Sequence, residues 1–285
     1  MKPTITRSTL AKAFALVACT AFAFVSPLAA PAQAQSDAEL KPMAVVAFSG
    51  YDALVEDVNF IGSLMGIPQL SQMFEPMIMG FTQGLDKSQP IGAVVLSDGV
   101  RTKGGICLPV TDFQQLLGNL QGLGISSEDD GDGNLKINAN GNELYAREAN
   151  GWAILAMHPM QFEGVPDDPG ALFATLTADY DLGVRAYIQN IPQDYRELLV
   201  QQLQMGMEQG LQKLPEESAE AYEARKKVAT AQIDQLTRLV NELDEFTFGL
   251  ALDGEEQRTY IDVVYTAVPG TTLADQVAQN SDPKS

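Results

Sequence analysis

The chain has 285 residues and 45% of them are apolar, which is enough to form one large globular domain or two small ones. It carries 18 Lys and Arg residues against 37 Asp and Glu residues, a formal net charge of -19. This balance excludes nucleic acid as a natural partner, because phosphate backbones are bound by basic surfaces that the chain lacks.

Residues 1–34 have the parts of a secretory signal peptide. Three basic residues precede an apolar run over residues 13–25, and an A-x-A cleavage motif ends at Ala34. Cleavage there would leave 15 basic and 37 acidic residues, a net charge of -22. No later apolar run is long enough to span a bilayer. We therefore expect a secreted or periplasmic protein without a transmembrane span.

An alternative is a lipoprotein, because the sequence Leu-Val-Ala-Cys resembles a lipobox with Cys19 as the acylated residue. Cleavage before Cys19 would leave an apolar run at the mature N-terminus, so we favour cleavage after Ala34. Only Cys107 remains in that mature chain, which excludes an intramolecular disulfide. Cys107 lies in an apolar strand pattern, and we interpret it as a small buried hydrophobic residue.

The segment 35–122 predicts the order strand, helix, helix, strand, strand, helix. The strands are expected at residues 43–48, 91–96 and 104–110, the last two joined by a Ser-Asp-Gly turn. A capping box of Ser49 and Asp52 would begin a helix that ends near Met65. A second helical pattern, residues 69–85, is interrupted at Pro76. Thr111 and Gln114 would cap a helix over residues 112–120.

The segment 123–180 predicts an acidic loop, β-hairpins and a short helix. Strands are expected at residues 135–138, 143–147 and 152–157, with Asn-Gly turns between them. A short helix would follow Asp168 and end at Thr177.

The segment 181–278 predicts the same element order as 35–122, followed by a polar tail over 279–285. A strand over 182–188 leads into a helix that Asn190 would cap, with Pro192 in its first turn. After Pro215 a second helix carries apolar residues at heptad spacing from Ala229 to Leu243. We expect the two helices to form a long antiparallel hairpin, which either packs within the fold or serves as a partner-binding arm.

Two alternating strands, 246–252 and 259–268, and a helix capped by Thr272 and Asp275 complete this segment. The repeated order suggests internal duplication of a β-α-α-β-β-α unit. Because the strands are joined by hairpins or helix pairs, we predict an α+β fold, with one or more antiparallel sheets and helices packed on one face.

No catalytic, cofactor-binding or metal-binding residue is predicted. The acidic loop from Glu128 to Asn134 resembles a calcium-binding EF-hand loop, but position twelve is Ala139 and a strand follows. We interpret it as a solvated loop, with calcium binding as the alternative. His158 is the only histidine and follows a strand at a His-Pro turn, without a nucleophile motif or further zinc ligands in the sequence.

Three stretches resemble an uncharacterised family of secreted proteins from planctomycete bacteria. They read NELYAREANGWAILA (142–156), YDLGVRAYIQNIPQDYRELLVQQLQMGMEQG (180–210) and RTYIDVVYTAVPGTTLADQ (258–276). The resemblance implies export but no activity, because that family has none established.

The leading hypothesis is therefore an exported, non-catalytic structural or binding module of the cell envelope, with an envelope protein as partner. One alternative is a carrier of an apolar small molecule or lipid held between sheet and helices. Its candidate lining is Met73, Met77, Met79 and Phe81. A weaker alternative is a carboxylate-dependent hydrolase, because paired carboxylates cannot be recognised from sequence spacing.

Overall fold

A computed structural model describes residues 39–74, 82–121, 125–139, 142–213, 215, 217–254 and 258–281. The predicted signal peptide and the C-terminal residues 282–285 lie outside these ranges. Within them the chain is an α+β protein with six α-helices and one antiparallel sheet. The segments 35–122, 123–180 and 181–278 all contribute strands to that sheet.

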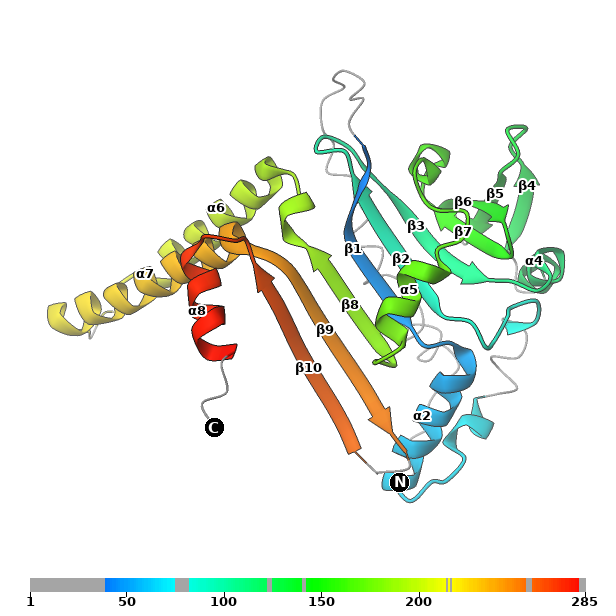
Figure 1. Cartoon of the computed structure of the whole chain (residues 1–285), viewed down its shortest axis with the longest axis horizontal. Coiled ribbons are helices and arrows are strands. Elements are labelled where there is room, and N and C mark those ends of the chain that lie inside the picture. Colours follow the sequence, from blue (N-terminus) through cyan, green and yellow to red (C-terminus); the bar gives the residue numbers. More distant parts are fainter. Residues whose placement is uncertain are drawn as a thin grey trace.

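The sheet has ten strands in the order β10-β9-β8-β1-β2-β3-β7-β6-β5-β4 (Figure 1). Their bounds are β1 Lys41–Phe48, β2 Ile91–Ser97, β3 Thr102–Pro109, β4 Ser126–Asp129, β5 Leu135–Ala139, β6 Asn142–Ala149, β7 Trp152–Ala156, β8 Leu182–Tyr187, β9 Leu243–Asp253 and β10 Arg258–Ala267. The helices are α2 Tyr51–Leu64, α4 Phe113–Gln121, α5 Gly170–Thr177, α6 Gln193–Gly210, α7 Ala219–Glu242 and α8 Thr272–Ser281. Short 3-10 helices are η1 Leu70–Met73, η2 Pro159–Phe162 and η3 Ile188–Asn190.

Each strand predicted from the sequence is present in the structure. The prediction succeeded because alternating apolar residues identify strands with one or two buried faces. The strand β4 was not predicted. Its sequence, Ser-Ser-Glu-Asp, has no apolar residue, and it forms by pairing with β5 at the edge of the sheet. Two residues that we assigned to the acidic loop, Glu128 and Asp129, therefore belong to a strand.

The prediction that helices pack on one face of the sheet is wrong. Neighbouring residues of β7 point to opposite faces, and both faces are covered by helices. Ile154 lies in a cluster with Phe173 of α5, whereas Ala153 lies in a cluster with Leu116 of α4. The part of the sheet around β3 and β7 is therefore a central layer between two helical layers.

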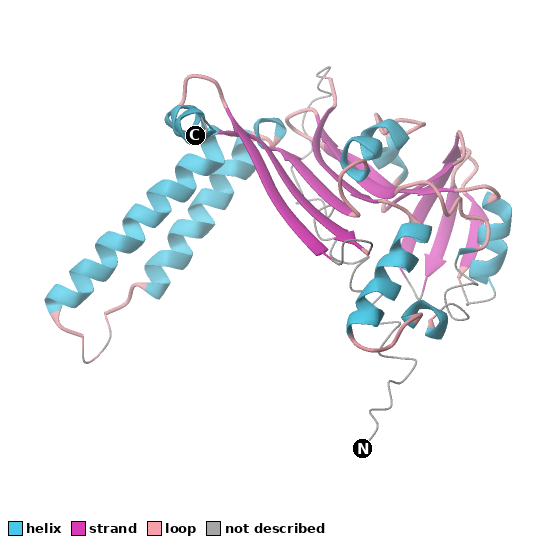
Figure 2. Cartoon of the chain, turned by 60° about the horizontal axis from the view of Figure 1, so that its bottom comes forward, coloured by secondary structure: helices cyan, strands magenta, loops and turns pink. Residues whose placement is uncertain are grey.

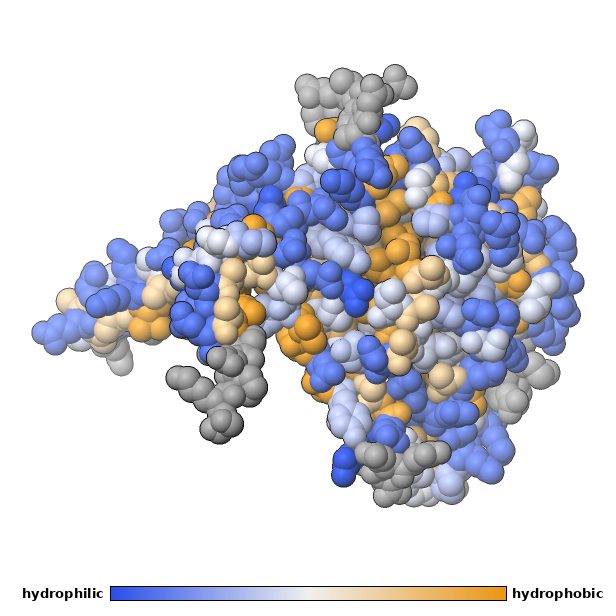
Figure 3. All heavy atoms as spheres, viewed as in Figure 1, coloured by the Kyte–Doolittle hydropathy of each residue, from blue (hydrophilic) through white to orange (hydrophobic). Residues whose placement is uncertain are grey.

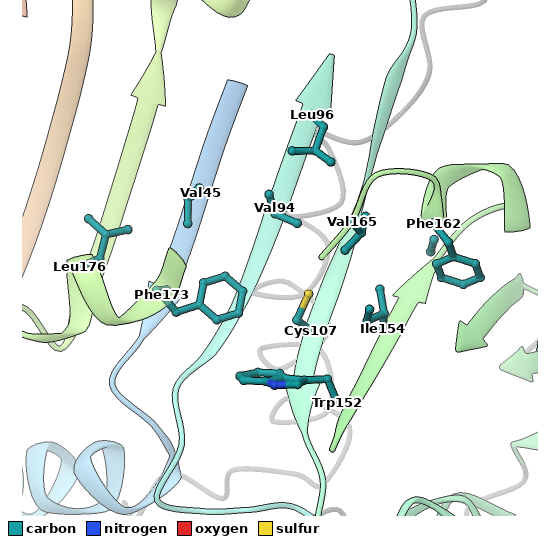
Figure 4. Close-up of a cluster of buried hydrophobic side chains, with 12 residues drawn as sticks. Val45, Val94, Leu96, Cys107, Trp152, Ile154, Phe162, Val165, Phe173 and Leu176 are labelled. Atoms are coloured by element: carbon teal, nitrogen blue, oxygen red, sulfur yellow. The ribbon is translucent and has the colours of Figure 1, made fainter. Parts of the chain in front are cut away.

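The first cluster is organised around Phe173 (Figure 4). Phe173 and Leu176 project from α5 onto the strands, and the Phe173 ring lies edge-on to Trp152 with centroids 5.8 Å apart. Gly92 provides the space for that ring, since a Cβ at this position would lie 2.5 Å from Phe173 Cε1. A short helix with two buried side chains therefore covers the centre of one face.

Four predicted helix starts differ from the observed ones. At α4, Asp112 and not Thr111 accepts the capping bond, from the Gln115 N–H at 2.8 Å. At α8, Thr271 and not Thr272 accepts the bond, from the Ala274 N–H at 3.2 Å. Neighbouring Asp and Thr residues are all good caps, so the sequence did not distinguish them.

The other two predicted caps serve tertiary contacts instead. Ser49 donates its hydroxyl to Asp181, and Gly50, with φ 124°, occupies the N-cap of α2. Asn190 donates its side-chain amide to Pro42 O at 2.7 Å, and α6 begins after Pro192. Leu243, predicted as the last heptad residue, is the first residue of β9, because α7 ends at Glu242.

The substitution Phe173→Ala should reduce the free energy of unfolding by about 3–5 kcal/mol, because it leaves a cavity against Trp152 and Gly92. Urea denaturation followed by tryptophan fluorescence measures the change. Leu64→Ala, at a side chain 65% exposed on α2, is the control and should change stability by less than about 1 kcal/mol. Equal effects of the two substitutions would contradict this account of the core.

Candidate functional site

In the half of the sheet formed by β8, β9 and β10, one face is apolar and the other is mainly polar, although Tyr260 and Val264 of β10 also point to it. On the polar face, Arg185 Nε donates to Thr247 Oγ1 at 3.2 Å and forms an ion pair with Glu245 at 3.1 Å. Gly183 points to the same side, because a Cβ there would meet Leu176 of α5. Figure 3 views the molecule from the side of α5, where hydrophilic residues cover most of the surface.

The opposite face carries three rows of apolar side chains that cross β2, β1, β8, β9 and β10. Residues paired directly across antiparallel strands point to the same face, so the printed register determines each row. In that strand order the rows are Ile91, Phe48, Leu182, Leu250 and Ile261; Ala93, Val46, Val184, Phe248 and Val263; and Val95, Ala44, Ala186, Phe246 and Tyr265. We call these side chains the apolar face.

The apolar face belongs to neither core cluster. Val95 is buried, and the exposure of the rows is greatest on β10, where Ile261 is 64%, Val263 55% and Tyr265 44% exposed. Within the described ranges, α5 packs on the opposite face of the sheet, and α4 packs on residues outside these three rows. The helices α2 and α7 contact β9. The face has the composition of a protein core without a described helix across it.

The helices α6 and α7 run side by side away from the sheet (Figure 2). Neither contains a buried residue among those described, and Leu199, Met205 and Val228 are 47%, 52% and 59% exposed. At the base of the pair, Gln189 of η3 donates to the carbonyls of Asn241 and Leu243. These helices therefore add further exposed apolar surface beside β9 and β10.

Near their tip a single arginine joins the two helices. Arg225 of α7 forms an ion pair with Glu217 at 2.7 Å and donates to Gly210 O at 3.2 Å, at the last residue of α6. A cation there also satisfies a carbonyl at the negative end of the helix. The connection between α6 and α7 is thus held by polar bonds at its surface.

An acidic cavity of about 500 Å³ lies where α2 meets the ends of β8, β9 and β10. Five carboxylates line it and no Lys, Arg or His does, among the described residues. They are Glu56 and Asp57 of α2, Asp179 and Asp181 before β8, and Asp253 at the end of β9. We call this site the acidic cavity.

Two of these carboxylates differ in role. Asp181 accepts the Ser49 hydroxyl at 3.3 Å and the Leu252 N–H at 2.7 Å, so it joins the ends of β1, β8 and β9. Burial, together with the negative charges of Asp181 and Glu56, raises the pKa of Asp57 to about 6. A perturbed carboxyl in a cavity is a common property of functional sites.

A second cavity of about 500 Å³ lies beside α5 and is lined by Trp152, Asp86 and Asp168 among others. Both carboxylates accept local hydrogen bonds, Asp86 from Ser88 and Asp168 from the Gly170 N–H. Both aspartates stabilise turns of the backbone, which is a common role of aspartate. Neither of these two carboxylates is therefore available as a catalytic group.

The sequence-predicted candidates do not come together in one site. Cys107 is fully buried, and burial raises the pKa of its thiol to about 12, so the nucleophilic thiolate is not formed near neutral pH. His158 is exposed and occupies the N-cap of η2, where its N–H donates to Gln161 Oε1 at 3.0 Å. Neither residue lies in the lining of the acidic cavity.

The acidic loop is the turn of the β4–β5 hairpin. Asp130 accepts hydrogen bonds from the N–H groups of Asp132 and Asn134, at 2.9 and 3.1 Å, and these bonds lower its pKa. In the ranges that the structure describes, no cluster of three or more His, Cys, Asp or Glu residues is arranged to hold a metal ion. Met73 is 66% exposed on η1, and Met77, Met79 and Phe81 lie outside the described residues.

Sequence reasoning missed both the acidic cavity and the apolar face as sites. The cavity collects its carboxylates from three separate stretches of the chain, at residues 56–57, 179–181 and 253, so no local motif marks it. The apolar alternation of β9 and β10 was recognised, but alternation signals burial of any kind. It does not distinguish a covered face from one that remains half exposed.

The substitution Asp57→Asn should stabilise the protein at neutral pH. Because the folded state raises the pKa of Asp57 above its ordinary value of 3.8, ionisation costs stability as pH rises from about 4 through 6. Two pKa units would correspond to about 2.7 kcal/mol for a fully buried group, and solvent screening of this partly exposed one reduces our expectation to about 1 kcal/mol.

Urea denaturation of the parent and the variant at pH 4 and pH 7 measures this effect. The two proteins should be equally stable at pH 4, and the variant more stable at pH 7. Asp234→Asn, at an exposed position in the middle of α7, is the charge-matched control and should show no such pH-dependent gain. A constant difference between parent and Asp57→Asn at both pH values would contradict the assignment.

The chain shows no similarity that identifies it. No protein-family model matches it, and neither a curated protein nor a solved structure matches it. In the described residues no helix has the length and apolar character needed to cross a bilayer.

Proposed function

We propose that the protein is an exported, non-catalytic binding module of the cell envelope that docks an apolar surface of a partner protein on its apolar face. The observation that carries this proposal is the continuity of three apolar rows over five strands, with the highest exposure on β10. Antiparallel sheets normally cover one such face and leave only a polar face in water.

The energetics support a docking role for this face. Monomeric proteins rarely expose apolar patches larger than about 300–600 Å² unless the patch serves an interaction. Burial of such a patch contributes about 25 cal/mol per Å², on the order of 10 kcal/mol before the costs of association. A partner that covers the rows would thus gain enough to form a specific complex.

We also propose that α6 and α7 are an antiparallel hairpin that acts as an arm beside the apolar face. A helix pair with no buried residue among those described gains little from its own packing, so contact with a partner is a reason for it to persist. The heptad spacing from Ala229 to Val240 supports this role, because its apolar side chains are half exposed or exposed.

The same proposal includes an internal duplication, of residues 43–122 and 181–278. Its support is the strand order, in which β1, β2 and β3 extend from one side of the β1–β8 pair and β8, β9 and β10 from the other. A duplication would relate the two groups of strands by an approximate two-fold axis near Val46 and Val184, which are paired in the register. Among the described residues, α6 and α7 of the second unit are longer than α2 of the first.

Two other functions rank lower. A carrier of an apolar ligand would require an enclosed apolar cavity, whereas the two cavities described above have mixed linings in which carboxylates lie beside apolar side chains. A carboxylate-dependent hydrolase is suggested by the pKa of Asp57 alone. Turnover in a panel of hydrolase substrates, lost in Asp57→Asn, would contradict the non-catalytic proposal.

Export should produce a mature N-terminus at Gln35, after removal of the predicted signal peptide. Mass spectrometry of the protein from its native host measures this mass. An acylated N-terminus at Cys19 would instead establish the lipoprotein alternative. The resemblance to a secreted planctomycete family supports export but does not distinguish the two products.

Polar substitution of the apolar face on β10 should weaken association with the envelope. We expect the amount of the triple variant Ile261→Thr, Val263→Thr and Tyr265→Thr in the envelope fraction of the native host to be about tenfold lower than that of the parent protein. Threonine keeps the β propensity of the strand, so the thermal unfolding midpoint should change little.

A matched control removes as many exposed apolar side chains from α2, as Leu54→Gln, Ile61→Gln and Leu64→Gln. This control should fractionate like the parent protein. Equal recovery of the parent and the β10 variant would show that the apolar face does not hold the protein at the envelope, and the proposed function would fail.

A further inference from the structure

The strand β10 is one edge of the sheet and is exposed along nearly its whole length. Its only neighbour in the described sheet is β9. Residues 258–266 are all exposed, on both faces of the strand. Five of them are large apolar or aromatic residues, namely Tyr260, Ile261, Val263, Val264 and Tyr265. An edge of this kind presents backbone N–H and C=O groups with which another strand can pair.

The two edges of the sheet differ in how well they are protected from such pairing. Proteins commonly protect an edge by keeping the strand short or by placing charged residues and proline in it. At one edge, β4 has four residues, of which Glu128 and Asp129 are acidic. At the other, β10 has ten residues and neither lysine nor proline among them. Its single basic and single acidic residue, Arg258 and Asp262, leave the strand neutral in a chain of net charge -19.

The helix α8 limits which part of β10 is open. It contacts β10 and lies beside the end of the strand that leads into it (Figure 1). On the apolar face the exposure of the β10 side chains decreases toward that end, from 64% at Ile261 to 55% at Val263 and 44% at Tyr265. A second strand would therefore meet the least obstruction beside residues 258–264.

We propose that the protein forms a two-fold symmetric dimer in which β10 pairs with β10 of a second copy as antiparallel strands, with the axis at Ile261. This inference goes beyond the proposed function, because backbone groups at the edge of β10 would form the contact, whereas the apolar face would dock the partner. The two sheets would become one continuous sheet. Their apolar faces would lie next to each other on the same side of it.

The symmetry of the pairing restricts its register. Residues directly opposite each other in antiparallel strands point to the same face, so an axis perpendicular to the sheet must pass through a residue that pairs with its own copy. An axis at Asp262 would place two carboxylates directly opposite each other, which is unfavourable. An axis at Ile261 avoids this contact and pairs residues 258–264, the part of the strand that lies away from α8.

This register also brings opposite charges together. Arg258 would lie opposite Val264 of the second copy, which makes it the diagonal neighbour of Asp262 of the second copy on the same face. Diagonal neighbours are about 7–8 Å apart, within reach of a long side chain. The symmetry produces this attractive pair twice, against one diagonal contact between the two Asp262 residues. Self-association at β10 is therefore favoured although the chain as a whole is acidic.

A second copy fits the edge better than a head-to-tail neighbour. Pairing of β10 with β4 of another molecule could use only the four residues of β4 and would place its acidic side chains on the contact. Pairing of two β10 strands over residues 258–264 provides about seven backbone hydrogen bonds, roughly one for each residue pair. That number is within the range of about 5–15 found in specific interfaces.

Sedimentation velocity of the purified protein over a concentration series should show a monomer in equilibrium with a dimer and no larger species. The substitution Ile261→Lys places two ammonium groups opposite each other at the axis and should raise the dissociation constant of the dimer at least tenfold. Leu64→Lys, on exposed α2, is the matched control and should dimerise like the parent protein. Circular dichroism and thermal unfolding establish that both variants are folded.

Cysteine cross-linking tests the register independently of any destabilising charge. Under oxidation Ile261→Cys should form a disulfide-linked dimer, because residue 261 pairs with its own copy. Thr259→Cys and Val263→Cys should each cross-link poorly alone but efficiently when the two proteins are mixed, because residues 259 and 263 are paired. Cys107 is fully buried and serves as no cross-linking site in the folded protein.

The outcomes separate this inference from the proposed function. A protein that remains monomeric would overturn the inference, as would a dimer that Ile261→Lys leaves intact or one that cross-links equally at residues 259, 261 and 263. Open-ended assemblies larger than a dimer would indicate head-to-tail pairing and would also overturn it. The oligomeric state of the purified protein does not depend on an envelope partner, so either proposal can fail while the other stands.

Discussion

The register of β8 between β1 and β9 is the constraint on which the two faces of the sheet depend. Val184 lies opposite Val46 on one side and Phe248 on the other. A slip by one residue would turn every side chain of β8 over and carry Arg185 into the apolar rows. Asp181 opposes such a slip, because one carboxylate holds Ser49 after β1 and the Leu252 N–H in β9.

That register also explains how one sheet serves two different purposes. Around β3 and β7 both faces are covered, by α5 on one side and α4 on the other, and the side chains there form the core. Towards β10 the polar face carries Arg185 and its partners, while the apolar face continues without a comparable cover among the described helices. Stability and the proposed binding therefore come from different parts of the same sheet.

Much of the fold could be predicted from the sequence, because alternation and turn residues act locally. The strands around Asn150-Gly151 and the helix ending at Thr177 are examples. Local rules were insufficient where neighbours compete, as between Thr111 and Asp112 for a cap, and where pairing alone creates a strand, as in β4. The acidic cavity depends on long-range register, so residues such as Asp57 and Asp253 could not be associated from their spacing.

The burial of Cys107 depends on the rate at which the sheet folds. Its strand, β3, is inside a sheet in which β1 pairs with β8 across more than a hundred residues of sequence. Pairing between segments so distant in the chain is slow, typically milliseconds to seconds for domains rich in such contacts. In the oxidising compartment that the proposed export would reach, this thiol would be open to mixed disulfides throughout that time, so the speed of sheet assembly would decide whether the molecule becomes native or is trapped as a covalent by-product.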